Sequence, residues 1–310
     1  MRLNDLILFV VTFGSTALAV VAPNLGTVFQ PYILYFMMCF LFLSFLKIDF
    51  RSFVDTSASS LASLGLLASV KLVVLPAVLY GAALVLLSDY ALPVLLISGI
   101  STGVVAPFVA SLVEADIALT LRMTIVSSVL VPFSLPVLVK ALAGTDITIP
   151  LEPMIRLLAL VIFIPMIAVL LLRRFFPSVP DKIAARQFPI SLVFFSIINL
   201  GVFSKYSSVF FDYPGQLLVA TVLAYFLSFI YYAVGFAITP GKPLAEQLGA
   251  GVSFAQMNNV LVIVFSAQFF GPLCPILAAM YMFPFFTMIV PVKLYASFRR
   301  GRSVETSGPA

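Results

Sequence analysis

The sequence predicts an all-α polytopic membrane protein, and its composition and the length of its apolar segments are the two observations that predict it. Of 310 residues, 62% are hydrophobic and only 9% are charged, whereas a soluble domain carries about a quarter charged residues. The apolar residues gather in stretches of roughly 20, the length a helix needs to cross a bilayer. The linkers between these stretches are too short for a soluble domain.

We expect about ten transmembrane helices. The first, which follows Arg2, has features of a signal peptide, but the nine hydrophobic segments after it favour a retained helix. Residues 1–298 should form a single transmembrane domain, with repeat one over about 1–148 and repeat two over about 149–298. Residues 299–310 should form a basic, disordered cytoplasmic tail. The predicted spans are 5–22, 29–46, 59–87, 91–113, 116–142, 153–176, 189–205, 215–238, 245–270 and 271–297.

The basic residues predict the orientation of these spans. With ten spans both termini share one side of the membrane, and that side carries twelve Lys and Arg residues against three on the other. Such an asymmetry favours cytoplasmic termini in the cytoplasmic membrane. The net charge of +5 is explained by topology, so we expect a lipid bilayer and no nucleic acid as a partner.

Lys71 is the most informative single residue, because it lies near the middle of the predicted span 59–87 with no other charge beside it. A lysine at the centre of a membrane helix costs roughly 2.5–3.5 kcal/mol, and such residues usually face a cavity or a partner. All twelve Asp and Glu residues fall at predicted span ends or in loops. The chain therefore lacks the usual intramembrane proton carrier and the usual anionic cation ligand.

Two predicted spans, the fourth and the ninth, contain polar interruptions at mid-depth, which suggests unwound helix. Non-helical backbone at that depth persists only where protein or a water-filled cavity satisfies it. Five spans precede the second half and five make it up. Because five is an odd number, the two halves must have opposite orientations in the membrane, and paired broken helices of inverted halves indicate a transporter's binding site. Glycine and proline are also simply common in membrane helices. The interruptions are 98–107 and 249–259, in which Ser101 matches Ser253 and Pro107 matches Asn259 at an offset of 152.

These residues resemble the bile acid:sodium symporter family. Residues 98–138 resemble its fourth and fifth helices, and Glu114–Thr120 matches the turn between them closely; Ser253–Asn259, followed by Gly271-Pro272-Leu273, resembles its ninth helix. The resemblance implies ten helices in two inverted five-helix repeats. It also implies a panel domain beside a core domain, in which discontinuous helices 4 and 9 cross.

The chain departs from the family at its sodium ligands. Thr120 and Thr124 match the family's fifth-helix hydroxyls, but its Ser-Asn pair in helix four is Ala106-Pro107 here. Ser253 stands where the family's ninth-helix motif has an acidic residue, and Lys71 where its third helix has a polar amide. An ammonium repels a neighbouring cation, since their interaction in a protein costs several kcal/mol at a few ångströms.

We therefore expect Lys71 to occupy the second cation site in place of sodium, with its ammonium directed toward Gln256 and Asn258. A desolvated lysine loses its proton readily, so Lys71 would couple transport to protons. The alternative is that Lys71 has a structural role only, as a pin whose ammonium is held by backbone carbonyls of the ninth span. Arg122 points away from the threonine face and either contributes charge to the core or extends toward Glu114 or Asp116 at the interface.

The sequence thus predicts a secondary active transporter of a small organic anion, with degraded sodium sites, no catalytic activity and no cofactor. Its coupling ion is a proton or sodium. The alternatives are a sodium-coupled organic anion symporter and an auxin-efflux-like export permease; the sequence leaves the oligomeric state open. Thr120, Thr124 and Ser253 are candidates for a residual sodium site. The candidate substrate- and ion-coupling residues are Lys71, Ser101, Thr102, Pro107, Thr120, Arg122, Thr124, Ser253, Gln256, Asn258 and Asn259.

Overall fold

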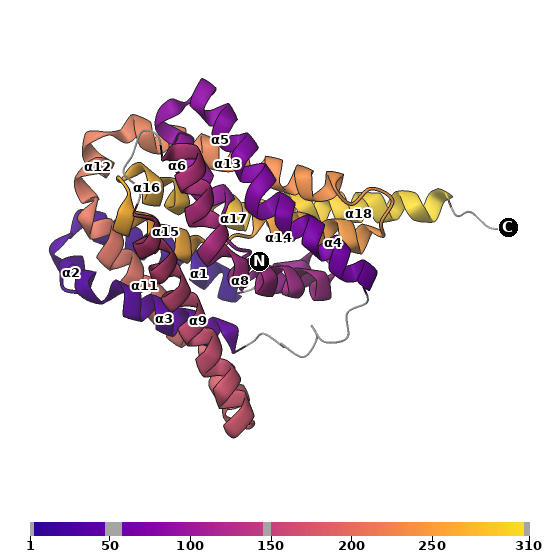
Figure 1. Cartoon of the computed structure of the whole chain (residues 1–310), viewed down its shortest axis with the longest axis horizontal. Helices are drawn as coiled ribbons and strands as arrows, with labels where there is room; N and C mark the ends of the chain where they lie inside the picture. The colour runs from indigo at the N-terminus through magenta and orange to yellow at the C-terminus, as the bar shows by residue number, and fades with distance from the viewer. Residues whose placement is uncertain (1–2, 47–57, 145–149, 307–310) are drawn as a thin grey trace.

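A computed structural model describes residues 3–46, 58–144 and 150–306, and within them the chain is helical and has no strand (Figure 1). The elements of the first half are α1 (Leu3–Val21), α2 (Asn24–Thr27), η1 (Gln30–Tyr32), α3 (Ile33–Phe45), α4 (Ala58–Ser69), η3 (Val70–Val74), α5 (Leu75–Leu86), η4 (Ser88–Tyr90), α6 (Ala91–Ser98), α7 (Ala106–Leu112) and α8 (Ile117–Ala143). Those of the second half are α9 (Leu151–Phe175), α10 (Val179–Ala185), α11 (Gln187–Lys205), α12 (Ser207–Asp212), α13 (Pro214–Ala237), α14 (Leu244–Ala255), α15 (Asn259–Phe269), α16 (Leu273–Met280), α17 (Met282–Thr287) and α18 (Ile289–Thr306).

The chain is an all-α membrane protein. Within the described residues, each of the ten ranges predicted as a span is mainly helical. In the described part of the chain, six helices are long and apolar enough to cross a membrane by themselves, and three shorter helices are apolar. The six are Leu61–Leu86, Ile117–Ala143, Leu151–Phe175, Gln187–Lys205, Pro214–Ala237 and Leu273–Arg300.

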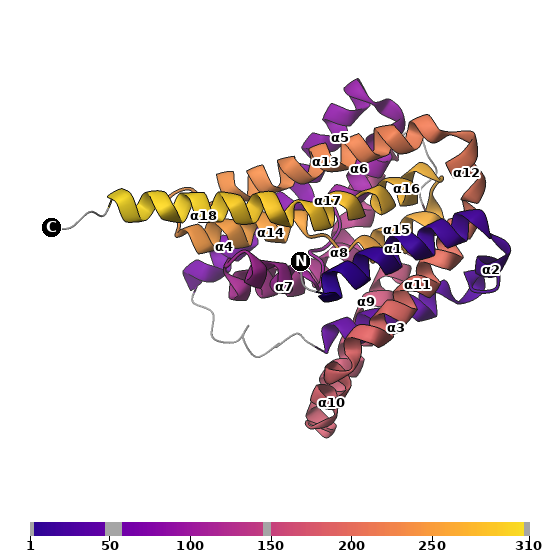
Figure 2. The same ribbon diagram turned by 180° about the vertical axis from the view of Figure 1, so that it is seen from behind.

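The helices pack in two groups that meet along α8, α9 and α15. In one group α11 packs against α1 and α3, and α3 packs against α9. In the other group α13 packs against α14 and α16, and α6 packs against α5 and α16. Figures 1 and 2 show the first group on the side of the molecule from which α9 and α10 project. The cavity described below is lined by α3 and α11 of the first group and by α7, α15 and α17.

The helix that carries Lys71 is not regular. Between α4 and α5 the turn η3 is a π-helix over Val70–Val74, and Lys71 is its second residue. Pro76 lies in the first turn of α5, where it cannot donate the backbone hydrogen bond that an uninterrupted α-helix would require. A wider turn before the proline accommodates this defect, and π turns of this kind often occur at functional sites.

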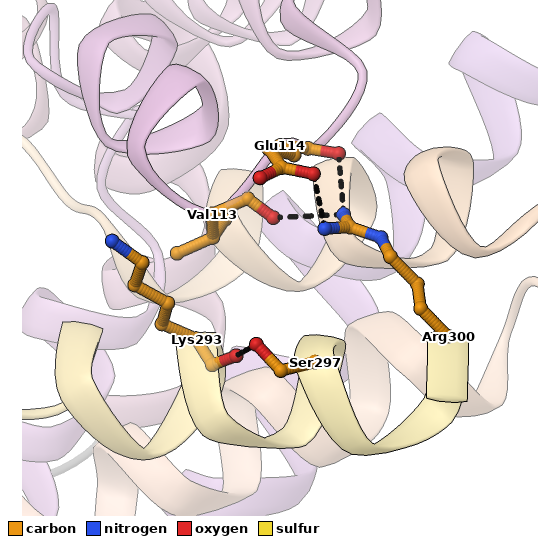
Figure 3. Close-up of polar contacts among 5 residues, drawn as sticks. All are labelled: Val113, Glu114, Lys293, Ser297 and Arg300. Carbon is orange, nitrogen blue, oxygen red and sulfur yellow. Dashed lines mark hydrogen bonds and ion pairs between the residues drawn. The ribbon is translucent and has the colours of Figure 1, made fainter. Parts of the chain in front are cut away.

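The C-terminal helix is anchored to the end of α7 by an ion pair. Arg300 pairs with the carboxylate of Glu114 and also donates to the backbone oxygens of Val113 (3.3 Å) and Glu114 (3.2 Å), as Figure 3 shows. Residues 299–306, which belong to the predicted disordered tail over 299–310, continue α18 as helix. The sequence pattern could not reveal a partner 186 residues away. Residues 307–310 lie outside the described part of the chain.

We predict that Glu114→Gly is more stable than Glu114→Ala. Glu114 has a φ of 55°, the one positive φ among the described residues other than glycine, and a left-handed conformation costs a side-chain-bearing residue about 1 kcal/mol or more. Both variants lose the ion pair with Arg300, so their difference in unfolding free energy, measured in mixed micelles, isolates the backbone strain. We expect about 1 kcal/mol in favour of glycine. Equal stabilities would show that the turn carries no strain at this residue.

Candidate functional site

The two interrupted helices meet at their interruptions, as the sequence predicts. The chain leaves the helix between Ser98 and Ala106 and again between Ala255 and Asn259. Thr102 and Met257 form an antiparallel bridge between these two segments. The amide of Gly103 donates to the carbonyl of Gln256 (2.7 Å), and the amide of Asn258 donates to the carbonyl of Ser101 (3.0 Å). Each unwound segment thus provides hydrogen-bond partners for the backbone of the other, which water would otherwise have to provide.

The close approach of the two segments depends on Gly103. A Cβ atom placed on this residue would lie 2.6 Å from the carbonyl oxygen of Met257 and 2.9 Å from its carbonyl carbon. Both atoms belong to backbone that cannot rotate away, so a larger residue would separate the segments. Glycine is required here for close packing of backbone on backbone.

The bounds of both interruptions differ from the prediction. Pro107 is not in unwound chain but in the first turn of α7, where its missing amide would lack an intrahelical partner anyway. Ser253 is not in unwound chain either. It lies in the last turn of α14, and its hydroxyl donates to the carbonyl of Gly249 (2.7 Å).

The last carbonyl groups of α14 point beyond the end of the helix, and three side chains from other elements donate hydrogen bonds to them. The Thr102 hydroxyl donates to the carbonyl of Ser253 (2.7 Å), the Lys71 ammonium to that of Phe254 (3.1 Å) and the Tyr281 hydroxyl to that of Ala255 (2.8 Å). Carbonyls at a helix end carry partial negative charge. The end of α14 therefore suits a cation, and Lys71 supplies one.

Lys71 points into the protein and not into lipid. Its side chain is 1% exposed, and it is the only charged residue among the buried side chains of the described chain. The ammonium also lies 5.7 Å from the centroid of the Phe254 ring, within range of a cation–π contact. The ammonium thus reaches the end of α14, two residues before the interruption, whereas the sequence prediction directed it toward Gln256 and Asn258. Its partner is a backbone carbonyl and not the side chain of Gln256 or Asn258.

The amides of the ninth-span interruption have other partners. Gln256 donates to the Tyr232 hydroxyl (3.1 Å) and to the carbonyl of Phe285 (3.1 Å). The Asn258 side chain caps α15 by accepting from the amide of Leu261 (3.4 Å). Asn259 donates to the sulfur of Met282 (3.2 Å), which is a weak acceptor.

Thr120 and Thr124 are fully buried, and each hydroxyl donates to its own helix, to the carbonyls of Asp116 (2.8 Å) and Thr120 (2.9 Å). The hydroxyl of α8 that contacts the fourth-span interruption is a third one, Ser127, which accepts from the amide of Thr102 (2.9 Å). Sequence analysis missed Ser127. It lies seven residues after Thr120, on the same helix face, and that spacing could have identified it.

Arg122 bonds to its own helix, α8. Its Nε atom donates to the carbonyl of Ala118 on its own helix (3.3 Å), and the residue is partly exposed.

The residues present do not fit a sodium ion beside Lys71. The ammonium bonds a helix-end carbonyl, and sodium prefers hard, preferably anionic, oxygen ligands. Within the described residues there is no group of three or more His, Cys, Asp or Glu that could hold a metal ion.

A cavity of about 280 Å³ adjoins the meeting point of the interruptions. Gly103, Met257 and Asn258 contribute to it from the unwound segments, and α3, α7, α11, α15 and α17 complete it. None of its lining residues is charged. Half of its twelve apolar lining residues, glycine not counted, are phenylalanines, namely Phe40, Phe108, Phe188, Phe195, Phe285 and Phe286.

We predict that Tyr281→Phe lowers the free energy of unfolding by about 1–3 kcal/mol, since the carbonyl of Ala255 would remain buried without its partner. Tyr225→Phe is the matched control, because the Tyr225 hydroxyl bonds Thr287 on an exposed face and exposed changes cost about 0.5 kcal/mol or less. Unfolding in mixed micelles measures both. A loss no larger for Tyr281→Phe than for the control would contradict the role given to this hydroxyl.

Comparison with known proteins identifies a family for this chain. The family described as the sodium bile acid symporter family matches residues 31–213, which is more than half of the chain. The match covers Lys71, the whole fourth span and both threonines of α8. No curated protein matches the chain significantly. With its membrane-spanning helices and this match, the chain belongs to the sodium bile acid symporter family.

Proposed function

We propose that this protein is a secondary active transporter of a small organic anion, in which Lys71 stands in for a coupling sodium ion. The observation that carries the proposal is the bond from the Lys71 ammonium to the carbonyl of Phe254 at the end of α14. Phe254 lies three residues before Met257, which lines the cavity at the two meeting interruptions. Membership of a transporter family supports transport. We assign the chain no catalytic activity.

The cavity favours an anion over a cation. No carboxylate lines it, and α15, an 11-residue helix, begins at its edge with Asn259 and Val260. The first turn of a helix carries partial positive charge, which suits a carboxylate. In α15 the amides of Asn259 and Leu261 already have acceptors, the carbonyl of Met257 (3.0 Å) and the side chain of Asn258 (3.4 Å), so the helix dipole favours the anion here rather than a row of unpaired amides. The anion would therefore bind near the start of α15, while Lys71 binds the end of α14 on the other side of the same interruption.

Lys71 would couple transport to protons through this contact. A charged ammonium donates a stronger hydrogen bond to the carbonyl of Phe254 than a neutral amine does. Loss of the proton would weaken the link between η3 and α14, and with it one of the bonds that hold the interruption. Protonation would restore the link. If Lys71 is instead a structural pin, its ammonium makes the same contact but keeps its proton throughout transport.

The arrangement in the membrane completes the proposal. We propose ten spans in two inverted five-helix repeats within residues 1–298, with both termini on the cytoplasmic side of the cytoplasmic membrane. The distribution of Lys and Arg supports this orientation. The cavity includes the start of α11, which follows Lys182 and Arg186, so it would face the cytoplasm.

Two alternatives within transport differ in measurable ways. A sodium-coupled organic anion symporter would require Thr120, Thr124 and Ser253 to bind sodium without a carboxylate. An auxin-efflux-like export permease would move the anion outward without sodium. Uptake into proteoliposomes under imposed sodium and pH gradients distinguishes all three.

Replacement of Lys71 tests the coupling. Lys71→Gln removes the charge and returns an oxygen ligand, so we expect transport that loses its dependence on the pH gradient and gains a sodium response. Lys71→Met should lose the pH dependence without gaining sodium. If both variants transport with the wild-type dependence on pH and sodium, Lys71 is a structural pin.

Sodium should have little effect on the wild-type protein. A ligand that binds only the folded state raises its stability with concentration, by about 2.7 kcal/mol at one hundred times the dissociation constant. Because the ammonium already bonds the end of α14, we expect millimolar sodium to leave the unfolding temperature nearly the same as potassium does. An upward shift of several degrees specific to sodium would support the sodium symporter instead.

A further inference from the structure

The cavity beside the interruptions contains polar atoms that the protein leaves without partners. The side-chain oxygens of Gln187 and Ser191 on α11 and of Asn259 on α15 are buried, line the cavity and have no hydrogen-bond partner among the described residues. Gln187 is 6% exposed and Asn259 is 4% exposed. Buried polar atoms are normally hydrogen-bonded, and unpaired ones are costly.

Gln187 and Ser191 form a pair on one face of α11. They are four residues apart, so both project to the same side of the helix, and that side faces the cavity. Ser196, also on α11, donates to the carbonyl four residues earlier (2.8 Å). Ser191 makes no such bond. Two further helical serines, Ser128 and Ser134 on α8, lack a partner among the described residues as Ser191 does, but they are not among the residues that line the cavity. An amide and a hydroxyl kept unpaired beside a cavity are poor structural residues and suitable ligand contacts.

The chemistry of this pair limits what it can bind. An amide and a hydroxyl both donate and accept, and neither carries charge. They suit a neutral group that also donates and accepts, such as a hydroxyl. A second carboxylate there would be desolvated with no cation among the lining residues. The phenylalanines around the pair suit an apolar body, and about 280 Å³ lies below the usual range for drug-sized ligands, about 300–1,000 Å³.

We propose that Gln187 and Ser191 determine specificity by binding a hydroxyl group of the transported anion, so that the substrate is a small hydroxylated monocarboxylate with an apolar body. This inference rests on the proposed transport function. The carboxylate lies at the start of α15, beside Asn259, and the hydroxyl lies against α11. The substrate therefore bridges α11 and α15.

The first test needs no ligand. Replacing an unpaired buried polar group by an apolar one of similar shape removes a cost, so Gln187→Leu and Ser191→Ala should unfold at the wild-type temperature or above it. Ser196→Ala is the matched control, because this variant loses the hydrogen bond that the Ser196 hydroxyl donates to the carbonyl of Leu192. A thiol-reactive dye measures unfolding through buried Cys274 in a Cys39→Ala background, because Cys39 is exposed. Marked destabilisation by both Gln187→Leu and Ser191→Ala would overturn the proposal.

The second test measures binding of two sets of acids to the purified full-length protein. Within each set the acids differ only in the group at C2. One set is 3-methylbutanoate with its 2-hydroxy and 2-carboxy derivatives, and the other is 3-phenylpropanoate with the same two derivatives. In at least one set the hydroxy acid should bind about tenfold more tightly than its parent, as judged by the concentration that raises the unfolding temperature. The dicarboxylate should bind more weakly than the hydroxy acid.

The variants then assign the preference to the pair. Gln187→Leu should remove the advantage of the hydroxy acid and leave the affinity for the parent acid unchanged, Ser191→Ala should reduce the advantage, and Ser196→Ala should keep it. A hydroxy acid that binds no better than its parent in both sets, or a preference that survives Gln187→Leu and Ser191→Ala, would overturn the proposal. Transport of a parent acid by wild-type protein in that case would leave the proposed transport function standing.

Discussion

The binding of the carbonyls at the end of α14 is the interaction on which the rest of the structure depends. A helix that ends inside a membrane leaves carbonyl groups that lipid cannot satisfy. Here Thr102, Lys71 and Tyr281 each donate to one of them, and Gly103 donates to the carbonyl of the following residue, Gln256. These donors come from the fourth, third and tenth predicted spans. The end of one helix therefore holds several others in place, and the cavity exists because the chain unwinds there.

Lys71 gives this arrangement its chemical character. A mobile cation at the end of α14 would come and go with its concentration, whereas an ammonium carried by η3 is always present and changes only through its proton. The π turn and the nearby proline give η3 a geometry that differs from a regular helix. A single residue thus combines a structural role at the end of α14 with a charge that solution conditions can alter, and the structural pin and the coupling group differ only in whether that charge changes during transport.

The sequence predicted the framework because the framework depends on local patterns. Lys71 was identified by its charge in an apolar stretch, and both interruptions were located by their glycines and amides. The ends of the interruptions were not predictable from composition. Pro107 is a helix-breaking residue and Ser253 a polar one, yet Pro107 lies in the first turn of α7 and Ser253 in the last turn of α14. The Tyr281 hydroxyl, the Arg300–Glu114 pair and the unpaired Gln187 were missed because each depends on a contact, or on the lack of one, between distant segments. The ten-span inverted repeat remains a prediction.

The central claim, that the Lys71 ammonium takes the place of a bound cation at the end of α14, is tested most directly by removing the side chain and offering a cation in solution. In Lys71→Ala the carbonyl of Phe254 loses its partner and the space of the side chain is free. The unfolding temperature of purified Lys71→Ala, titrated with sodium or methylammonium and with choline as the ionic-strength control, is the measurement. The account predicts a saturable rise with sodium or methylammonium in the variant and none in the wild type. A variant whose stability is the same in all three cations would contradict it.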